Sequence, residues 1–279
     1  MKVIDNMDRR TRLRLLVVLG PLAVLALSAL CYAWLGQVAL LLPPVLIGIF
    51  LGWCYMDLRG YQLKLFERDF AEQNATFAQV EAIIALNGFL RPGRPFPATR
   101  GWAASPDLLL EMVNHVLLEK TELVVEASSG VSTVMLAYAM ERKGSGRVIA
   151  LEHDASYAAK TRALLDYHGV AHRATVVHAP LVEQQVDGDV YKWYDLSKAA
   201  IDAPIGLLVV DGPPEATGPM ARYPAVPLLR DKFAPGARVL LDDGARAAER
   251  LMAERWKTGH RAVSCELLPM DKAVWSLRF

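Results

Sequence analysis

Five acidic residues stand where short apolar runs of the sequence end, and carboxylates at such positions can bind a cofactor or a cation. They are Glu126, Glu152, Asp211, Asp242 and Asp243. The apolar runs before them are typical of buried parallel strands. In an open α/β sheet, ligands bind beyond the carboxyl ends of the strands. The pattern therefore predicts one crevice in which these carboxylates meet.

A loop of small residues follows the first of these runs. Ser128, Ser129 and Gly130 allow a sharp turn, and a helical pattern begins at Val131. The first N–H groups of that helix would point at a ligand above the turn. Glu152 lies twenty-two residues after Gly130, close to the roughly 20-residue spacing at which nucleotide-binding folds place an acid for the ribose. The spacing favours a nucleotide-like cofactor, although any tight strand–helix turn would have a similar loop.

Four segments together resemble class I S-adenosylmethionine-dependent methyltransferases, most closely the predicted O-methyltransferases with a Val-Glu-x-Gly-Ser-Gly-x-Ser-Thr loop. They are Glu126-Ala-Ser-Ser-Gly-Val-Ser-Thr133, Leu151-Glu-His-Asp154, Val210-Asp-Gly-Pro-Pro214 and Leu241-Asp-Asp-Gly244. The resemblance runs from about Trp102 to Phe279. In one departure, Ser128 stands where the family usually has its first loop glycine, and serine suits that turn unless φ must be positive there.

The resemblance implies a set of residues that bind S-adenosylmethionine. The set is Glu126, Ser128, Ser129, Gly130, Ser132, Thr133, Glu152, His153 and Asp211. Glu126 would contact the methionine moiety, or would only cap the following turn. Glu152 would accept two hydrogen bonds from the ribose diol. His153 and Asp154 would be neighbours of the adenine, or would cap a helix.

The resemblance to catechol-type O-methyltransferases also implies a divalent cation. In those enzymes, acids at the ends of the fourth and fifth strands hold the ion, and oxygen ligands suit Mg²⁺. The matching residues are Asp211, Asp242 and Asp243, of which Asp211 and Asp243 are the candidate catalytic residues. The alternative is that these acids only cap turns. The family's lysine just past the fourth strand is missing, which leaves the general base open, with His178 a weak candidate.

The composition points to a membrane-associated protein rather than a nucleic-acid-binding one. Of 279 residues, 53% are hydrophobic, above the usual 45–50%, and the excess lies near the N-terminus. The net charge of +1 gives no indication of nucleic acid as a partner. Cys31, Cys54 and Cys265 match no metal-binding spacing, and we interpret them as reduced structural residues.

Two charge-free runs near the N-terminus, Leu15–Leu35 and Val38–Met56, are each long enough to span a bilayer. Only Gly36-Gln37 separates them, which predicts a transmembrane helical hairpin. A signal peptide would have a shorter apolar core and no second span, and Leu30 argues against a lipoprotein signal at Cys31. A hydrophobic hairpin inside a globular core is the remaining alternative.

Basic residues flank the two runs, and the turn between them has none. These residues are Arg9, Arg10, Arg12 and Arg14 before the first run, and Arg59, Lys64 and Arg68 after the second. Both ends should therefore face the cytoplasm. This predicts a multi-pass membrane protein whose catalytic domain lies on the cytoplasmic side, where a small-molecule or lipid-linked acceptor near the bilayer would be methylated.

The chain divides into three expected parts: 1–56, the N-terminus and two-span hairpin; 57–100, an amphipathic helix and linker; and 101–279, the methyltransferase domain. The helix should run from Asp57 to about Leu86, and 91–97 should break it. Its apolar stripe is Leu63, Phe66, Phe70, Phe77, Val80, Ile83 and Ile84. The stripe could dock on the catalytic domain, lie on the membrane or form a homo-oligomer through residues 57–90.

The expected fold class is α/β: a Rossmann-like, seven-stranded methyltransferase sheet with antiparallel last strands, preceded by the transmembrane hairpin. Helices are expected at 105–119, 131–143, 156–168, 224–232 and 245–257, and closing strands at 261–268 and 272–279. Residues 181–204 are expected to form a long irregular loop.

Three function classes follow from this interpretation. We favour a membrane-anchored methyltransferase. An NAD-type oxidoreductase is the weakest alternative, because the loop does not fit G-x-G-x-x-G. A catalytically silent membrane scaffold that kept the fold is the third, since fold does not imply function.

Overall fold

The computed structural model describes residues 9–99 and 103–279 of the chain, and the contacts divide it into two units, residues 1–73 and 74–279. The N-terminal residues 1–8 and the predicted start of the methyltransferase domain at 101–102 lie outside the described residues.

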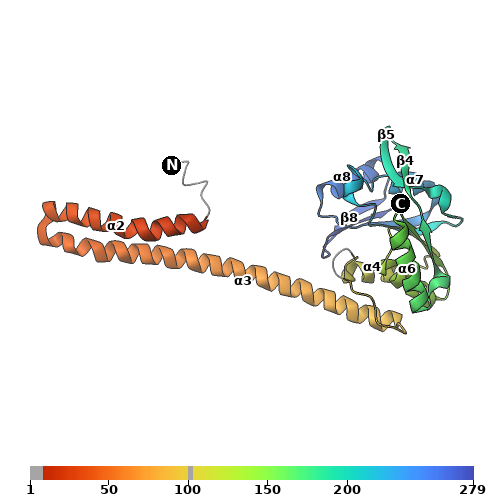
Figure 1. The fold of residues 1–279 in the computed structure, drawn as a ribbon, viewed down its shortest axis with the longest axis horizontal. Coiled ribbons are helices and arrows are strands. Elements are labelled where there is room, and N and C mark those ends of the chain that lie inside the picture. The colour runs from red at the N-terminus through yellow and green to blue at the C-terminus, as the bar shows by residue number, and fades with distance from the viewer. Residues whose placement is uncertain (1–8, 100–102) are drawn as a thin grey trace. The chain divides into compact units, whose positions relative to one another are not determined.

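The first unit consists of helices. Helix α2 (Arg9–Leu35) is followed by a 3₁₀ helix, η1 (Gly36–Leu41), and by the first part of α3 (Leu42–Leu90). In Figure 1, α3 runs back alongside α2. The two helices are in contact, since a Cβ added to Gly20 of α2 would lie 3.7 Å from the ring of Phe50 in α3. The connection is longer than the predicted Gly36-Gln37, and α3 continues without interruption from the second apolar run into the helix predicted to begin at Asp57.

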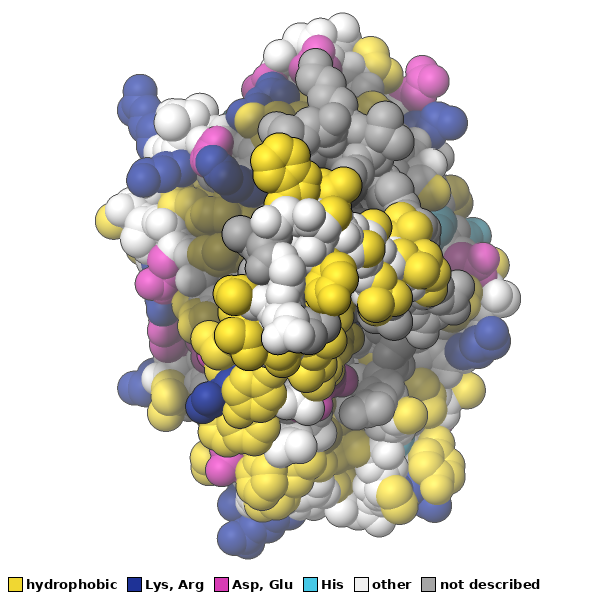
Figure 2. All heavy atoms as spheres, turned by 90° about the vertical axis from the view of Figure 1, so that its left-hand side faces the viewer, with side chains coloured by type: hydrophobic (Ala, Val, Ile, Leu, Met, Phe, Trp, Pro, Cys, Tyr) yellow, Lys and Arg dark blue, Asp and Glu magenta, His cyan; other side chains and the backbone are white. Residues whose placement is uncertain are grey.

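The described surface of α2 and of the start of α3 is strongly apolar. Its large hydrophobic side chains are exposed, and they cover the helices nearest the viewer in Figure 2. One helical stretch among the described residues, Gly36–Leu90, is long and apolar enough to cross a membrane, and Val18–Trp34 is a shorter apolar stretch. Cys31, Cys54 and Cys265 are free and partly buried. The side chains of Arg9, Arg10, Arg12 and Arg14, on which the predicted orientation rests, lie outside the described part of the structure.

The second unit is built on a seven-stranded sheet with strand order β3-β2-β1-β6-β7-β9-β8. Strands β3, β2, β1, β6 and β7 are parallel, and β9 pairs antiparallel with both β7 and β8. The strands are β1 (Leu123–Ala127), β2 (Arg147–Glu152), β3 (Ala174–His178), β6 (Ile205–Val210), β7 (Phe233–Leu241), β8 (Ser264–Leu268) and β9 (Val274–Arg278). The predicted seven-stranded sheet with an antiparallel closing pair is confirmed.

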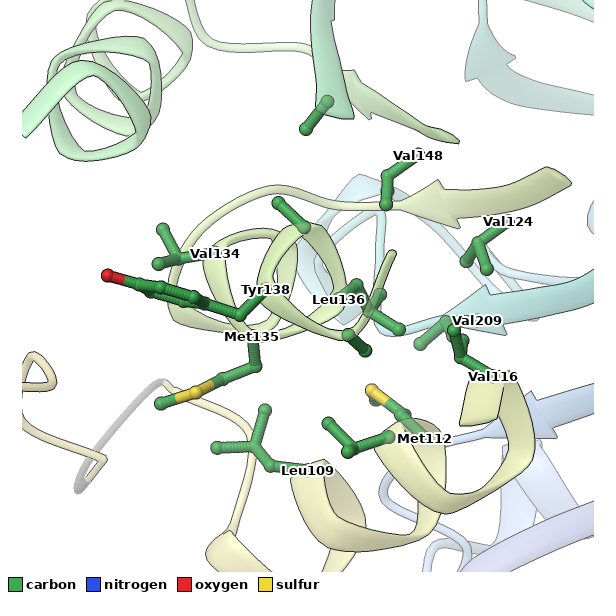
Figure 3. Packing of buried hydrophobic residues seen from close by; sticks show 14 of the residues in the cluster. Leu109, Met112, Val116, Val124, Val134, Met135, Leu136, Tyr138, Val148 and Val209 are labelled. Atoms are coloured by element: carbon green, nitrogen blue, oxygen red, sulfur yellow. The ribbon is translucent and has the colours of Figure 1, made fainter. Parts of the chain in front are cut away.

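Helices cover both faces of this sheet, because alternate residues of each buried strand point to opposite sides. Val124 packs with the core of one face, whereas Leu123 and Val125 pack with the core of the other. The first face carries α4 (Pro106–Leu118), α5 (Val131–Lys143), α6 (Ala155–His168) and the end of α3; the second carries α7 (Ala225–Leu229) and α8 (Ala247–Gly259). Figure 3 shows α4 and α5 packed against β1, β2 and β6.

Short 3₁₀ helices complete the second unit. They are η2 (Ala171–Arg173), η3 (Leu196–Lys198), η4 (Glu215–Thr217) and η5 (Arg230–Lys232). The helix predicted at 224–232 is therefore shorter, since its last turn is η5. Ser105 stands at the N-cap of α4 as expected, but its side chain makes no capping hydrogen bond.

The last turns of α3 dock on the first face of the sheet. Ala82, Leu86 and Leu90 are buried there, and Gln79 donates a hydrogen bond to Asp107 at the start of α4 (2.9 Å). The predicted stripe is not the docked face: except for Ile83, its residues are exposed. The periodicity thus located the helix, and the residues of α3 that are buried in the second unit are Ala82, Leu86 and Leu90.

The loop predicted at 181–204 is largely a β-hairpin. Strands β4 (Leu181–Val186) and β5 (Asp189–Tyr194) pair antiparallel along their full length and form a separate two-stranded sheet. Asp187 (φ +50°) and Gly188 (φ +89°) make the turn. An Asp-Gly dipeptide between two strands is the usual sequence signal for a turn with two positive φ angles, so the signal was present and was missed.

Candidate functional site

The turn from β1 into α5 is organised around the buried carboxylate of Glu126. Thr133 Oγ1 donates to Glu126 Oε2 (2.6 Å), and Ser132 Oγ donates to Glu126 Oε1. Thr133 Oγ1 also accepts the backbone N–H of Gly130 (3.0 Å). Glu126 thus fixes the first turn of α5, as its predicted capping role requires. A cofactor contact for Glu126 stays a prediction.

Burial raises the pKa of Glu126 to about 7. Loss of hydration disfavours the charged form of a carboxyl group. The hydrogen bonds from Ser132 and Thr133 oppose this shift, and the charge of Glu152 adds to it. The two acids at the ends of β1 and β2 are therefore close enough to influence each other.

Ser128 and Gly130 both adopt backbone conformations that favour glycine. Their φ angles are +154° and +153°. At Gly130 this carries no steric penalty, but at Ser128 the Cβ meets the neighbouring backbone. The family's usual glycine at position 128 thus has a physical reason, and Ser128 is a strained replacement for it.

Glu152 ties the loop after β1 to the end of β2. Its Oε2 accepts the hydroxyl of Ser129 (2.9 Å), and its Oε1 accepts the backbone N–H of Asp154 (3.0 Å). Ser129 Oγ also lies 3.0 Å from Thr161 Oγ1 on α6. His153 Nδ1 lies 3.1 Å from Glu152 Oε1.

Asp154 caps α6. Its side chain accepts the backbone N–H groups of Ser156 and Tyr157. This confirms the helix-cap interpretation of Asp154, whereas the roles of Glu152 and His153 toward an adenosine remain predictions.

The three predicted aspartates meet at the ends of β6 and β7. One oxygen from each of Asp211, Asp242 and Asp243 lies within 4.8 Å of the others. Their proximity follows from the register, since Asp211 and Asp242 directly follow the paired residues Val210 and Leu241. Carboxylates at this separation repel one another unless a cation or a proton intervenes.

Arg222, which the sequence analysis did not identify, supplies such a cation. Its Nη2 lies 3.2 Å from Asp211 Oδ1 and 2.9 Å from Asp243 Oδ2. Its Nη1 donates to the main-chain oxygen of Asp242 (3.0 Å). The Arg222 side chain is only 5% exposed, and Glu249 Oε1 lies 3.8 Å from Nη1. Arg246 approaches the same cluster from a more exposed position, 3.0 Å from Asp243.

Two features of the aspartate cluster bear on the predicted Mg²⁺, and they point in opposite directions. The three carboxylates suit a hard cation, and Asp242 Oδ2 is buried without a hydrogen-bond partner among the described residues. However, Arg222 already contacts the other two aspartates, and its guanidinium stays protonated in proteins. A divalent ion beside it would meet a fixed positive charge. The observed arrangement therefore does not fit Mg²⁺.

Burial raises the pKa of Asp211 to about 7. The charges of Asp242 and Asp243 add to the shift, and Arg222 opposes it. Burial also raises the pKa of Asp242 and of Glu249. A carboxyl group that titrates near neutral pH can take up and release a proton under physiological conditions.

Tyr194 is a second residue that the sequence analysis missed. It ends the β4–β5 hairpin, is 1% exposed, and its hydroxyl would overlap a Cβ placed on Gly212. Burial raises its pKa well above 10, with the charges of Glu152 and Asp211 adding to the shift. Tyr194 is therefore close to both groups of acids, those that follow β1 and β2 and those that follow β6 and β7. His178, by contrast, ends the edge strand β3, separated from β6 by two strands.

This arrangement defines an α/β protein with a class I S-adenosylmethionine-dependent O-methyltransferase-like fold. Residues 127–244 match the family model of a methyltransferase domain. An SAH-bound methyltransferase from Podospora anserina is 14% identical, with a TM-score of 0.52 over 76% of this chain and 95% of that one. The solved structure shows the fold, and the family model places a methyltransferase domain at residues 127–244.

Two further structures are similar at lower scores. An O-methyltransferase from Bacillus cereus in complex with SAH is 15% identical, with a TM-score of 0.45 over 72% of this chain and 91% of that one. TomG, an O-methyltransferase from Streptomyces achromogenes in complex with SAM, is 17% identical, with a TM-score of 0.46 over 63% and 82%. A search of curated proteins found no match.

Proposed function

We propose that this protein is a membrane-anchored, S-adenosylmethionine-dependent methyltransferase that methylates an oxygen of a membrane-associated or lipid-linked acceptor. The observation that carries the proposal is the pair of linked acids at the ends of β1 and β2. Glu126 holds the first turn of α5, and Glu152 holds Ser129 of the loop. A cofactor with a charged amino-acid end and a ribose needs such a loop with acids on either side.

In this proposal, S-adenosylmethionine lies across the carboxyl ends of β1 and β2. Gly130 and Ser129 present the loop backbone to the methionine end, and the Glu152 carboxylate accepts the ribose hydroxyls in place of Ser129. His153 lies beside the adenine. The protein contributes mainly by holding the methyl group and the acceptor oxygen in line, which is the largest source of rate in such transfers.

Asp211 is the proposed general base. The acceptor hydroxyl gives its proton to the Asp211 carboxylate as its oxygen bonds to the methyl carbon, and the bond between that carbon and the sulfonium sulfur breaks. The products are the methylated oxygen and S-adenosylhomocysteine, and Asp211 then releases the proton to water. The raised pKa, about 7, supports the role, because a base is most effective when its pKa is near the working pH.

The apolar helices of the first unit support the membrane anchor. We propose that α2 and the start of α3 form a two-span hairpin with both ends and the catalytic unit on the cytoplasmic side. In a variant without the three native cysteines, a cysteine at Lys2 or at the exposed Val263 should be labelled by a membrane-impermeant thiol reagent only after the cells are opened. Labelling of either position in intact cells would contradict this topology.

A catalytically silent scaffold is the second candidate, and the strained Ser128 favours it. If the loop no longer binds cofactor, selection against a non-glycine residue at this φ would be relaxed. The two candidates differ in whether the protein binds S-adenosylmethionine.

Calorimetry with the full chain in detergent separates these functions. The wild-type protein should bind S-adenosylmethionine and not NAD. Glu152→Ala should weaken the binding by roughly 1.5–3 kcal/mol, the usual contribution of a hydrogen bond to a charged group. Glu141→Ala, which removes an exposed acid of α5, is the control and should leave the affinity unchanged. If wild-type protein binds no S-adenosylmethionine, the scaffold interpretation holds; unchanged affinity in Glu152→Ala would refute the assignment of Glu152.

A further inference from the structure

The contacts of Arg222 join all three aspartates of the cluster into one unit. Nη2 bridges Asp211 and Asp243 from the ends of two adjacent strands, while Nη1 holds the main chain at Asp242. A planar guanidinium suits this bridging because its N–H groups point in fixed directions. Arg222 therefore occupies the position between β6 and β7 that a shared metal ion would need.

Burial strengthens the interaction between the Arg222 charge and the carboxylates of the cluster. Arg222 is 4% exposed, Asp242 1% and Glu249 3%, so water cannot screen their charges well. Two unit charges 4 Å apart interact by about 4 kcal/mol at the effective dielectric constant near a protein surface, and by more inside. The positive charge of Arg222, which stabilises the aspartates, would therefore repel a divalent ion that approached them.

We propose that Arg222 is the resident cation of this carboxylate cluster and takes the place of a divalent ion, so that the acceptor end of the crevice works without metal. Arg222 acts as a positioning residue: it orients the carboxylate of Asp211 and lowers the repulsion among the three aspartates. The consequence for catalysis rests on the proposed methyl transfer, whereas the exclusion of metal from the cluster does not.

The buried oxygen Asp242 Oδ2 makes the proposal testable by a gain of binding. It has no hydrogen-bond partner among the described residues, and Asp211 would lose its contact with the guanidinium if Arg222 were replaced by a neutral residue, while Asp243 would keep only the more exposed Arg246. Three carboxylates that have lost their buried cation are ligands for a hard divalent ion, because the remaining cation in contact, Arg246, is 42% exposed. Removal of the Arg222 charge should therefore create a metal site that the wild-type protein lacks.

The experiment is a titration of the full chain in detergent with Mn²⁺, with the free ion followed by electron paramagnetic resonance. The wild-type protein should show no saturable site that depends on Asp242. Arg222→Gln should bind Mn²⁺ at least about tenfold more tightly than the wild-type protein does, because a repelling charge within 4 Å has been removed. The double variant Arg222→Gln, Asp242→Asn should lose the gain. Arg222→Lys keeps the positive charge and should therefore not bind Mn²⁺ at this cluster.

Arg246→Gln is the matched control. Arg246 also pairs with Asp243, at 3.0 Å, but its side chain is 42% exposed and it has no ion pair with Asp211. Its removal should create no site. In the activity assay, the wild-type rate should be unchanged by excess chelator, whereas any activity of Arg222→Gln should depend on added Mn²⁺.

The proposal would be overturned if the wild-type protein bound Mn²⁺ and the Asp242→Asn variant did not. It would also be overturned if methyl transfer by the wild-type protein stopped on chelation. The wild-type titration decides the question even if Arg222→Gln does not fold. Because Mn²⁺ binding needs no turnover, a protein without any methyl transfer would refute the proposed function and leave the metal result standing.

Discussion

The loop after β1 offers the sharpest stability prediction, because one of its two serines is strained and the other is not. Ser128 has φ +154°, whereas Ser129 has an ordinary negative φ and donates to Glu152. A non-glycine residue at positive φ costs about 1–2 kcal/mol. Glycine adds about 0.4–1 kcal/mol of chain freedom to the unfolded state. Ser128→Gly should therefore stabilise the protein by about 0.5–1 kcal/mol, since the Ser128 hydrogen bond it loses is long, at 3.5 Å.

Thermal unfolding followed by near-ultraviolet circular dichroism would measure this change, because Trp193 and Trp256 are fully buried in the second unit. The expected rise in Tm is about 1–4 °C for a domain of this size. Ser129→Gly is the matched control and should lower Tm, because it loses bonds to Glu152 and Thr161 and gains no relief of strain. If both variants change Tm in the same direction, the backbone at Ser128 is not strained.

Three further predictions follow from the site and the hairpin. The rate of methyl transfer should rise with pH through about pH 7 as Asp211 loses its proton, and Asp211→Asn should lower it by about 10²–10⁴-fold. The pKa values of Glu126 and Asp211 are raised in the folded state, so the stability that these two groups contribute should be complete below about pH 4 and should be lost as pH rises through about 7. Thermal melting at a series of pH values would measure this dependence, and Asp211→Asn should make it weaker. Gly188→Ala should cost about 1 kcal/mol or more because φ is +89° in the hairpin turn, whereas Gly259→Ala, which has open space around it, should not destabilise; chemical denaturation compares the two.

Local signals in the sequence were sufficient to predict most of the second unit. Helix α5 begins and ends at the expected residues, because small loop residues precede it and Gly144 ends it at φ +89°. The acids lie at the same edge of the sheet because parallel strands align their carboxyl ends, which depends only on the strand order. The β4–β5 hairpin could also have been predicted from its Asp-Gly turn.

The rest depended on contacts between distant residues. Arg222 lies in an irregular segment with no motif around it, and it becomes important only when β6 and β7 bring Asp211 and Asp243 to it. The docked face of α3 was equally hidden, since periodicity reveals that a helix has an apolar side but not which of two apolar sides meets the core. The cation beside the aspartates was hidden for the same reason: the repulsion among them was inferred from the sequence, but Arg222, which relieves it, comes from another part of the chain.

The hydrogen bonds around the cofactor loop have a consequence for how a ligand would be recognised. Ser129 is tied to Glu152 and Thr161, and Gly130 is tied to Thr133, which is itself held by Glu126. The loop is thus ordered before any ligand arrives, and apart from the Ser129–Glu152 bond, which the ribose would replace, binding would require little loss of conformational entropy. Recognition by such a preformed loop selects ligands by shape: a molecule that does not match the existing N–H groups gains little, because the loop cannot adapt to it.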